Sequence, residues 1–172
     1  MPNWCDCDLT IEGPRDRLEQ FLCEVVSEQS LFDFARVVPY PDQFRELDRL
    51  ATEWEKKPPE ERIGPPPTDG FNQGGYEWRI ENWGTKWPAR GVSLDRDQWP
   101  DLEGSSSRVS FHFSTAWSPP RPVVERAAEC FPELKFALRY FERGCQYQGV
   151  FVCKLGVVRV DKEWFYSGDR GG

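Results

Sequence analysis

Residues 4–11 read Trp-Cys-Asp-Cys-Asp-Leu-Thr-Ile, and apolar and polar side chains alternate along this stretch. A period of two residues places the odd-numbered side chains on one face of a strand and the even-numbered ones on the other. Gly13-Pro14 ends the strand, and the apolar spacing from Leu18 to Val26 predicts an amphipathic helix directly after it. The chain therefore opens with a half-buried strand followed by a helix.

The same patterns return further along the chain and predict a second strand–helix–strand half. Ser118-Pro119-Pro120 opens the second helix, with Ser118 as its N-cap and a proline in its first turn. Two such halves predict an α+β, ferredoxin-like βαββαβ sandwich, in which an antiparallel sheet carries its helices on one face. A strand is predicted at 31–38, ended by Pro39, and period-two alternation predicts strands at 108–115 and 135–141. Residues 146–154 and 157–160 flank Leu155-Gly156 and predict a closing C-terminal β-hairpin.

Residues 42–107 separate the two predicted halves and have a different character. A helical spacing over 42–54 is followed by a charged, proline-rich stretch at 55–67, which predicts an extended linker. A short helix is predicted at 76–83, a brief strand at 92–94 and a polar turn at 101–107. We expect one ferredoxin-like domain over 1–172 with an inserted subdomain at 42–107, and an insertion of this length is commonly functional.

Composition excludes several classes of protein. The chain has 172 residues, 15% of them aromatic, which excludes a disordered chain. Its net charge of −7 makes general nucleic-acid binding unfavourable, because phosphate binding needs a basic surface. No apolar run approaches the roughly 20 residues of a membrane span, and the first residues lack the features of a signal peptide. We therefore expect a cytoplasmic protein with no membrane partner.

The six cysteines are expected to be free thiols rather than disulfides or metal ligands. No secretion signal supports disulfides, and no CxxC pair suggests a zinc site. Cys5-Asp6-Cys7 with the lone His112 is an alternative metal site, and we otherwise predict no cofactor.

Residues 82–87, Asn-Trp-Gly-Thr-Lys-Trp, are the most concentrated polar and aromatic segment. Two indole rings around a cation and hydrogen-bonding groups suit a nucleotide or a peptide loop. The alternative is that Trp83 and Trp87 anchor the insertion on the sheet while Gly84 caps a helix. The candidate binding residues in this segment are Asn82, Trp83, Thr85, Lys86 and Trp87.

A second candidate binding segment is Thr115-Ala116-Trp117-Ser118, where a strand leads into a helix. N–H groups at a helix N-terminus attract anions, so Thr115 and Ser118 are candidates for holding a phosphate or carboxylate. The alternative is a capped turn with Trp117 as a packing residue. We predict no catalytic residue, although Asp6, Asp8 and His112 lie on polar strand faces and form a candidate metal-dependent nuclease site.

Four motifs in this order resemble the YubB-type ferredoxin-like domain family of plasmid- and phage-borne proteins. The resemblance spans nearly the whole chain, and it implies the ferredoxin-like fold and an origin in a mobile element, but no activity. The motifs are Pro2-Asn3-Trp4-Cys5 with Leu9-Thr10-Ile11-x-Gly13, then Asn82-Trp83-Gly84-Thr85-Lys86-Trp87, Thr115-Ala116-Trp117-Ser118-Pro119-Pro120 and Tyr140-Phe141-Glu142-x-Gly144.

Three functions remain open at this point. We expect a non-enzymatic binding protein of a mobile genetic element that sequesters or inhibits a host protein, such as a defence protein, because tryptophan is enriched at protein contacts. The second is a binder of a nucleotide-like small ligand, through Trp83, Lys86, Trp87 and Trp117. The third is a metal-dependent nuclease.

Overall fold

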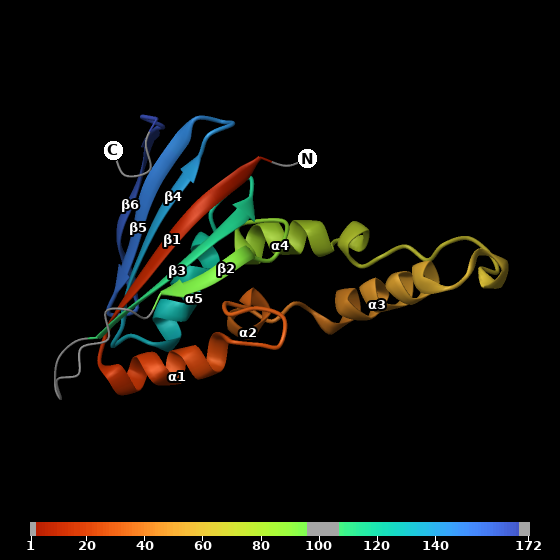
Figure 1. Cartoon of the computed structure of the whole chain (residues 1–172), viewed down its shortest axis with the longest axis horizontal. Coiled ribbons are helices and arrows are strands. Elements are labelled where there is room, and N and C mark those ends of the chain that lie inside the picture. The colour runs from red at the N-terminus through yellow and green to blue at the C-terminus, as the bar shows by residue number, and fades with distance from the viewer. Residues whose placement is uncertain (1–2, 96–106, 169–172) are drawn as a thin grey trace.

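The computed structural model describes residues 3–95 and 107–168. They form a six-stranded, fully antiparallel sheet in the order β2-β3-β1-β4-β5-β6, with helices against one face of it (Figure 1). The α+β, ferredoxin-like class with an antiparallel sheet is thus confirmed. The strands are β1 Trp4–Gly13, β2 Arg90–Asp95, β3 Ser107–Ala116, β4 Lys135–Glu142, β5 Tyr147–Lys154 and β6 Val157–Phe165.

Helices α1 and α5 lie between the strands in the chain and provide the second layer. Both bury an apolar stripe, from Leu18 to Val25 in α1 and from Val123 to Ala128 in α5, and the stripe predicted from Leu18 to Val26 extends one residue past α1. The helices are α1 Arg15–Val25, α2 Phe34–Val37, α3 Asp42–Lys56, α4 Gly75–Trp83 and α5 Arg121–Cys130, with 3₁₀ turns η1 Pro59–Glu61 and η2 Phe71–Gln73.

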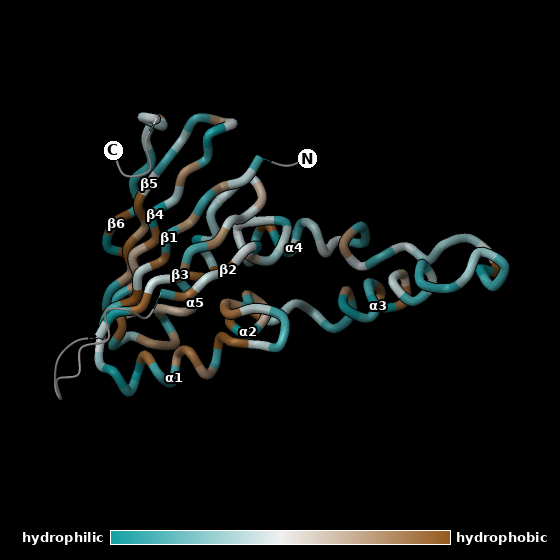
Figure 2. The backbone as a smooth tube through the Cα atoms, viewed as in Figure 1, coloured by the Kyte–Doolittle hydropathy of each residue, from teal (hydrophilic) through white to brown (hydrophobic). Residues whose placement is uncertain are grey.

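The core lies between the helices and the odd-numbered side chains of β1. Cys5, Cys7, Leu9 and Ile11 are all fully buried, which confirms the face that the alternation predicts. In Figure 2, hydrophobic stretches follow the strands, α1 and α2, whereas the region around α3 is mostly hydrophilic. Within the described ranges, 3–95 and 107–168, no helix combines the length and apolar character that a membrane span requires.

The predicted strand at 31–38 is wrong. Phe32 and Phe34 are buried as a strand would bury them, but they enter the core from a turn and the short helix α2. The carboxylate of Asp33 caps that helix by accepting a hydrogen bond from the backbone N–H of Ala35, at 2.9 Å. Alternating burial therefore comes from two aromatic side chains on either side of an N-cap residue, not from a strand.

The strand beside β3 is instead β2, which the sequence indicates only as a brief strand at 92–94. Helices α2, α3 and α4 consequently lie between α1 and β2 rather than between two complete halves. The segment 42–107, predicted to be an inserted subdomain, thus contributes one strand to the sheet. The polar turn predicted at 101–107 lies outside the described residues except for Ser107, which begins β3.

The thiols give a direct test of this burial pattern. All six cysteines are free; Cys5, Cys7 and Cys153 are buried, and the others, Cys23, Cys130 and Cys145, are exposed. Burial raises the pKa of the Cys7 thiol well above its ordinary value and raises the pKa of Cys153 to about 11. Because the thiolate is the reactive form, we expect Ellman's reagent to titrate three thiols in the folded protein. The other three should appear only in denaturant, and immediate reaction of all six would contradict the fold.

Candidate functional site

The face of the sheet opposite α1 and α5 carries the even-numbered side chains of β1, and we call it the open face. The Asp6 carboxylate accepts a hydrogen bond from the Ser114 hydroxyl at 3.0 Å. In the next pair of facing residues on β1 and β3, His112 Nδ1 lies 2.7 Å from Asp8 Oδ1. Neighbouring strands therefore join their polar side chains in pairs across this face.

Cations outnumber carboxylates on the open face, although the chain as a whole has a net charge of −7. The Glu12 carboxylate is held by Arg108 and by Lys135, at 2.8 and 3.0 Å. Hydrogen bonds from Arg108 first, and then from Lys135, lower the pKa of Glu12 below its ordinary value. By strand register, the described charges of this face are the cations Arg90, Arg108, Lys135, Arg139, Lys154 and Lys162 and the carboxylates Asp6, Asp8, Glu12 and Asp95.

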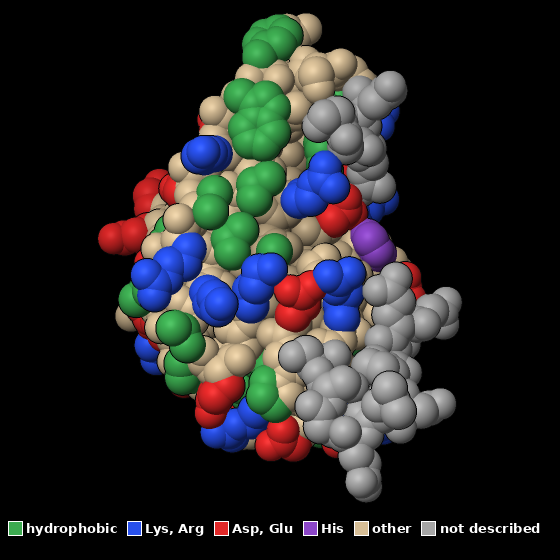
Figure 3. Space-filling view, turned by 90° about the vertical axis from the view of Figure 1, so that its left-hand side faces the viewer, with side chains coloured by type: hydrophobic (Ala, Val, Ile, Leu, Met, Phe, Trp, Pro, Cys, Tyr) green, Lys and Arg blue, Asp and Glu red, His purple; other side chains and the backbone are tan. Residues whose placement is uncertain are grey.

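Apolar side chains run between these cations. Figure 3 shows hydrophobic side chains in a band along this side of the molecule, with Lys and Arg side chains on both sides of it. The register places Ala137, Val150, Val152 and Val160 next to one another on β4, β5 and β6, all of them partly exposed. The open face thus offers an apolar strip bordered by positive charge.

Two half-buried indole rings form one end of the open face. The ring centroids of Trp4 and Trp87 are 6.2 Å apart, and the rings are tilted by 42°. The Arg90 guanidinium lies 5.1 Å from the Trp4 ring, and the Lys86 ammonium lies 4.2 Å from the Trp87 ring. Each ring therefore has its own cation, and we call these four residues the aromatic–cation cluster.

The two predicted binding segments, 82–87 and 115–118, meet in the structure. The Thr85 hydroxyl donates to the Ala116 carbonyl at 2.9 Å, and the Ser118 hydroxyl donates to the Gly84 carbonyl at 2.5 Å. Ser118 is therefore not the N-cap that the sequence predicts for α5, because its hydroxyl is used between the two segments. Pro120 occupies the cap position of that helix.

Most of the polar side chains in these segments are used inside the domain. Thr115 is buried and donates to the Ser118 carbonyl at 2.8 Å, and the buried Trp83 indole donates to the Val38 carbonyl at 2.9 Å. Asn82 donates to the Trp78 carbonyl within α4, at 2.9 Å. These bonds favour a structural role for Asn82, Trp83, Thr85, Thr115 and Ser118.

Lys86, Trp87 and Trp117 remain accessible after these bonds are made. Trp117 has a left-handed backbone, with φ of 72°, and its side chain is exposed. Both polar groups of the Trp117 backbone are hydrogen-bonded. Its N–H donates to the Asn3 carbonyl at 3.0 Å, and its carbonyl accepts from the Tyr147 hydroxyl at 2.5 Å. The strained backbone is therefore fixed in a way that presents the indole outward.

The sequence reasoning missed Trp4, Arg90, Arg139 and Lys162 as candidate site residues. Trp4 shares the even-numbered face of β1 with Asp6, so strand periodicity alone was a signal for it. The three cations come from three different strands and meet only through the register of the sheet.

The proposed metal arrangements do not form. Cys5 and Cys7 face the core while His112 lies on the open face, so these three side chains cannot converge. Asp8 and His112 are adjacent, but among residues 3–95 and 107–168 no three His, Cys, Asp or Glu side chains are grouped to hold an ion. The nuclease alternative therefore gains no support from the described side chains.

A second surface is the projecting arm, residues 42–73, which extends away from the sheet (Figure 1). Its helix α3 has no buried residue. At its base, Asp48 accepts hydrogen bonds from the Phe71 backbone and from Arg79, at 3.0 and 3.3 Å. At its tip, Arg62 donates to the Glu55 and Lys57 carbonyls at 2.6 and 2.9 Å. The arm is thus held at both ends.

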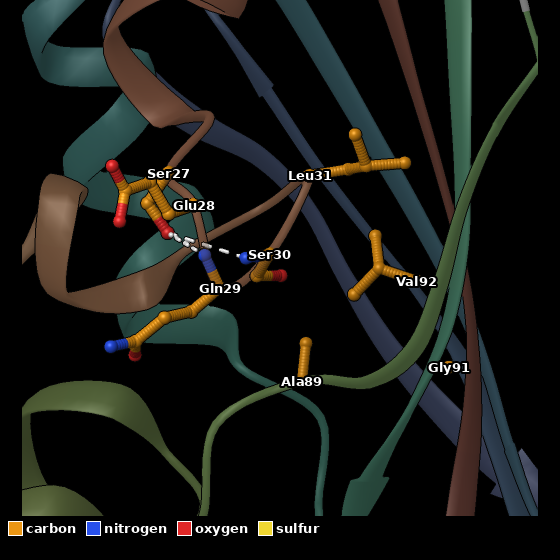
Figure 4. A pocket seen from close by; sticks show the side chains of 8 residues that line it. All are labelled: Ser27, Glu28, Gln29, Ser30, Leu31, Ala89, Gly91 and Val92. Carbon is orange, nitrogen blue, oxygen red and sulfur yellow. Dashed lines mark hydrogen bonds between the residues drawn. The ribbon is translucent and has the colours of Figure 1, made fainter.

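A small pocket lies between the turn after α1 and the start of β2 (Figure 4). Leu31 and Val92 line its apolar side, and the Ser27 hydroxyl accepts hydrogen bonds from the backbone of Gln29 and Ser30 at 3.2 and 3.3 Å. The Glu28 carboxylate points away from Leu31 and Val92. The pocket therefore presents no charged group toward its apolar lining.

The sheet and its helices define an α+β protein of the ferredoxin-like class. Residues 96–169 match a family model described as the ferredoxin-like domain in Api92-like protein. The crystal structure of protein api92 from Yersinia pseudotuberculosis is similar over 99% of this chain and 100% of that chain, with a TM-score of 0.54 and 10% identity. At this identity the likeness shows the fold alone. No curated protein matches the chain.

Proposed function

We propose that this chain is a non-enzymatic binding protein that captures a protein partner with its projecting arm. The observation that carries the proposal is the incomplete burial of α3, a helix of 15 residues none of which is fully buried and whose apolar side chains are only partly covered. Its apolar residues recur at helical spacing at Phe44, Leu47, Ala51 and Trp54, which is the pattern of a helix that packs against something. Only Phe44, at the base, packs against the core.

The arm has the stiffness that such a role requires. Arg79 links its base to the domain, because its guanidinium lies 4.2 Å from the Tyr40 ring while it also bonds Asp48. The Arg62 guanidinium lies 5.2 Å from the Trp54 ring near the tip. A preordered element binds with a smaller loss of conformational entropy than a flexible one. The arm therefore supports recognition of the helix-in-groove kind, in which a partner offers an apolar groove.

Two exposed apolar side chains mark the contact surface. Leu50 is 41% exposed on α3, and Ile63 is 91% exposed near the tip. The partner in this proposal is a host protein, and the mobile-element origin that the YubB-type resemblance implies stays a prediction. A nucleotide-like ligand is the second candidate, and the aromatic–cation cluster is the observation that favours it.

The test is capture of partners from host lysate by the immobilised protein, with quantitative mass spectrometry. We expect Leu50→Gln with Ile63→Gln to abolish capture, because the substitutions remove the apolar contact without changing charge. Leu155→Gln is the matched control, since Leu155 is an exposed leucine in the β5–β6 turn. Equal capture by the arm variant and the wild type would refute a role for the arm. A nucleotide-dependent rise in Tm would instead favour the second candidate.

A further inference from the structure

We propose that the open face binds a single strand of nucleic acid, with bases stacked on its indole rings and phosphates bound by the cations beside them. This activity uses a different surface from the projecting arm and does not depend on the proposed function. It also revises the expectation drawn from net charge, because a net charge says nothing about how charges are distributed over the faces of a protein.

The open face keeps an excess of positive charge. The carboxylates of Asp6 and Glu12 are already hydrogen-bonded within the face. Four of the cations take no part in the ion pairs found within residues 3–95 and 107–168, and with Asp8 and Asp95 also counted, the six cations of the face exceed its four carboxylates by two. The four cations outside these ion pairs are Arg90, Arg139, Lys154 and Lys162.

Cations on the open face lie beside aromatic rings. Besides the aromatic–cation cluster, the Arg139 guanidinium lies 5.7 Å from the Phe141 ring, and Lys162 stands two residues from the exposed Trp164 on β6. The register places Phe141 opposite Asp6 on β1 and opposite Gln148 on β5, and Gln148 opposite Trp164. Phe141 and Trp164 therefore lie in one row of the sheet, with the Phe141 ring buried, and Arg139 and Lys162 lie in the adjacent row.

The combination of cations and aromatic rings favours single-stranded nucleic acid over other anionic ligands. Base–aromatic stacking needs an exposed base face, which a single strand offers and a duplex does not. An acidic polypeptide would use the cations but would leave the half-buried rings of Trp4 and Trp87 and the exposed ring of Trp164 without a role. His112 adds a polar group, because Asp8 holds its Nδ1 and directs the ring at a partly exposed site.

The experiment measures fluorescence anisotropy of labelled oligo(dT) and oligo(rU), each about 12 nucleotides long, at salt concentrations of about 50 and 200 mM. We expect binding that weakens with salt, with a slope in log K of roughly −0.7 for each phosphate contact. Trp87→Ala should weaken binding by roughly tenfold, as expected for loss of one stacked base. Arg139→Glu should weaken it and reduce the salt slope.

Arg126→Glu is the matched control, because it makes the same charge change at an exposed arginine of α5, on the other side of the sheet. Arg139 is also exposed, so both variants should keep the wild-type Tm. Absence of salt-dependent binding to either oligonucleotide would overturn the proposal, as would equal losses in the Arg139 and Arg126 variants. Equal competition by polyglutamate or by duplex DNA would also overturn it and would assign the face to acidic surfaces in general.

Discussion

Replacing Trp83 with alanine is expected to lower the free energy of unfolding by about 3–5 kcal/mol. The indole is only 2% exposed, and its ring centroid lies 6.0 Å from that of Phe34 and 5.7 Å from those of Tyr40 and Trp78. Its Nε1 also donates to the Val38 carbonyl at 2.9 Å, so truncation leaves both a cavity and an unpaired carbonyl. Urea denaturation followed by far-UV circular dichroism measures the loss.

Trp87→Ala is the matched control for this prediction. The same substitution is made four residues away, at an indole that is half-buried in the aromatic–cation cluster, and we expect a much smaller loss of stability. If Trp83→Ala cost no more than Trp87→Ala, the anchoring role of Trp83 would be wrong. Unchanged stability together with lost partner binding would instead make Trp83 a binding residue.

Strand β1 was predictable because its two faces meet different environments. Its odd-numbered residues contact the core and its even-numbered residues lie on the open face, so a period of two appears in the sequence. Helices α1 and α5 were predictable for the corresponding reason, since each buries one stripe and exposes the rest.

Strand β2 was harder to predict because its pattern is weak. It is an edge strand of six residues, it pairs only with β3, and its register shifts between Arg90 and Ser93. Its side chains are exposed or partly exposed, so the sequence shows little alternation. The strand was predicted instead at residues 31–38, an apolar-rich stretch that ends before Pro39.

The candidate surfaces also differ in how well the sequence predicts them. The segments 82–87 and 115–118 stand out in the sequence because each is locally rich in aromatic and polar residues, and hydrogen bonds do bring them together. The positive charge of the open face leaves no local trace, because its cations are spread over five strands. Only the pairing of those strands gathers them on one face.

Replacing Gly149 with alanine is expected to cost about 1–3 kcal/mol through overpacking. Gly149 lies on β5, directly opposite Tyr140 on β4, and an added Cβ would overlap Oη and Cζ of that ring and approach the Lys162 carbonyl to 2.5 Å. The ring has little freedom to move, because Tyr140 is fully buried and its hydroxyl contacts both Arg121 and Glu163. Burial raises the pKa of Tyr140 well above its ordinary value, so the hydroxyl stays protonated as a donor.

A double-mutant cycle with Tyr140→Leu separates this clash from a general effect on the strand. Leucine removes the phenol that the new Cβ would meet, so the double variant should lose less stability than the two single variants together. The single Tyr140→Leu variant reports the cost of losing the contacts with Arg121 and Glu163. Chemical denaturation of all four proteins gives the coupling energy, and strict additivity would mean that the phenol is not what excludes a side chain at position 149. Coupling would instead show that the buried phenol on β4 is what excludes a side chain at position 149 of β5.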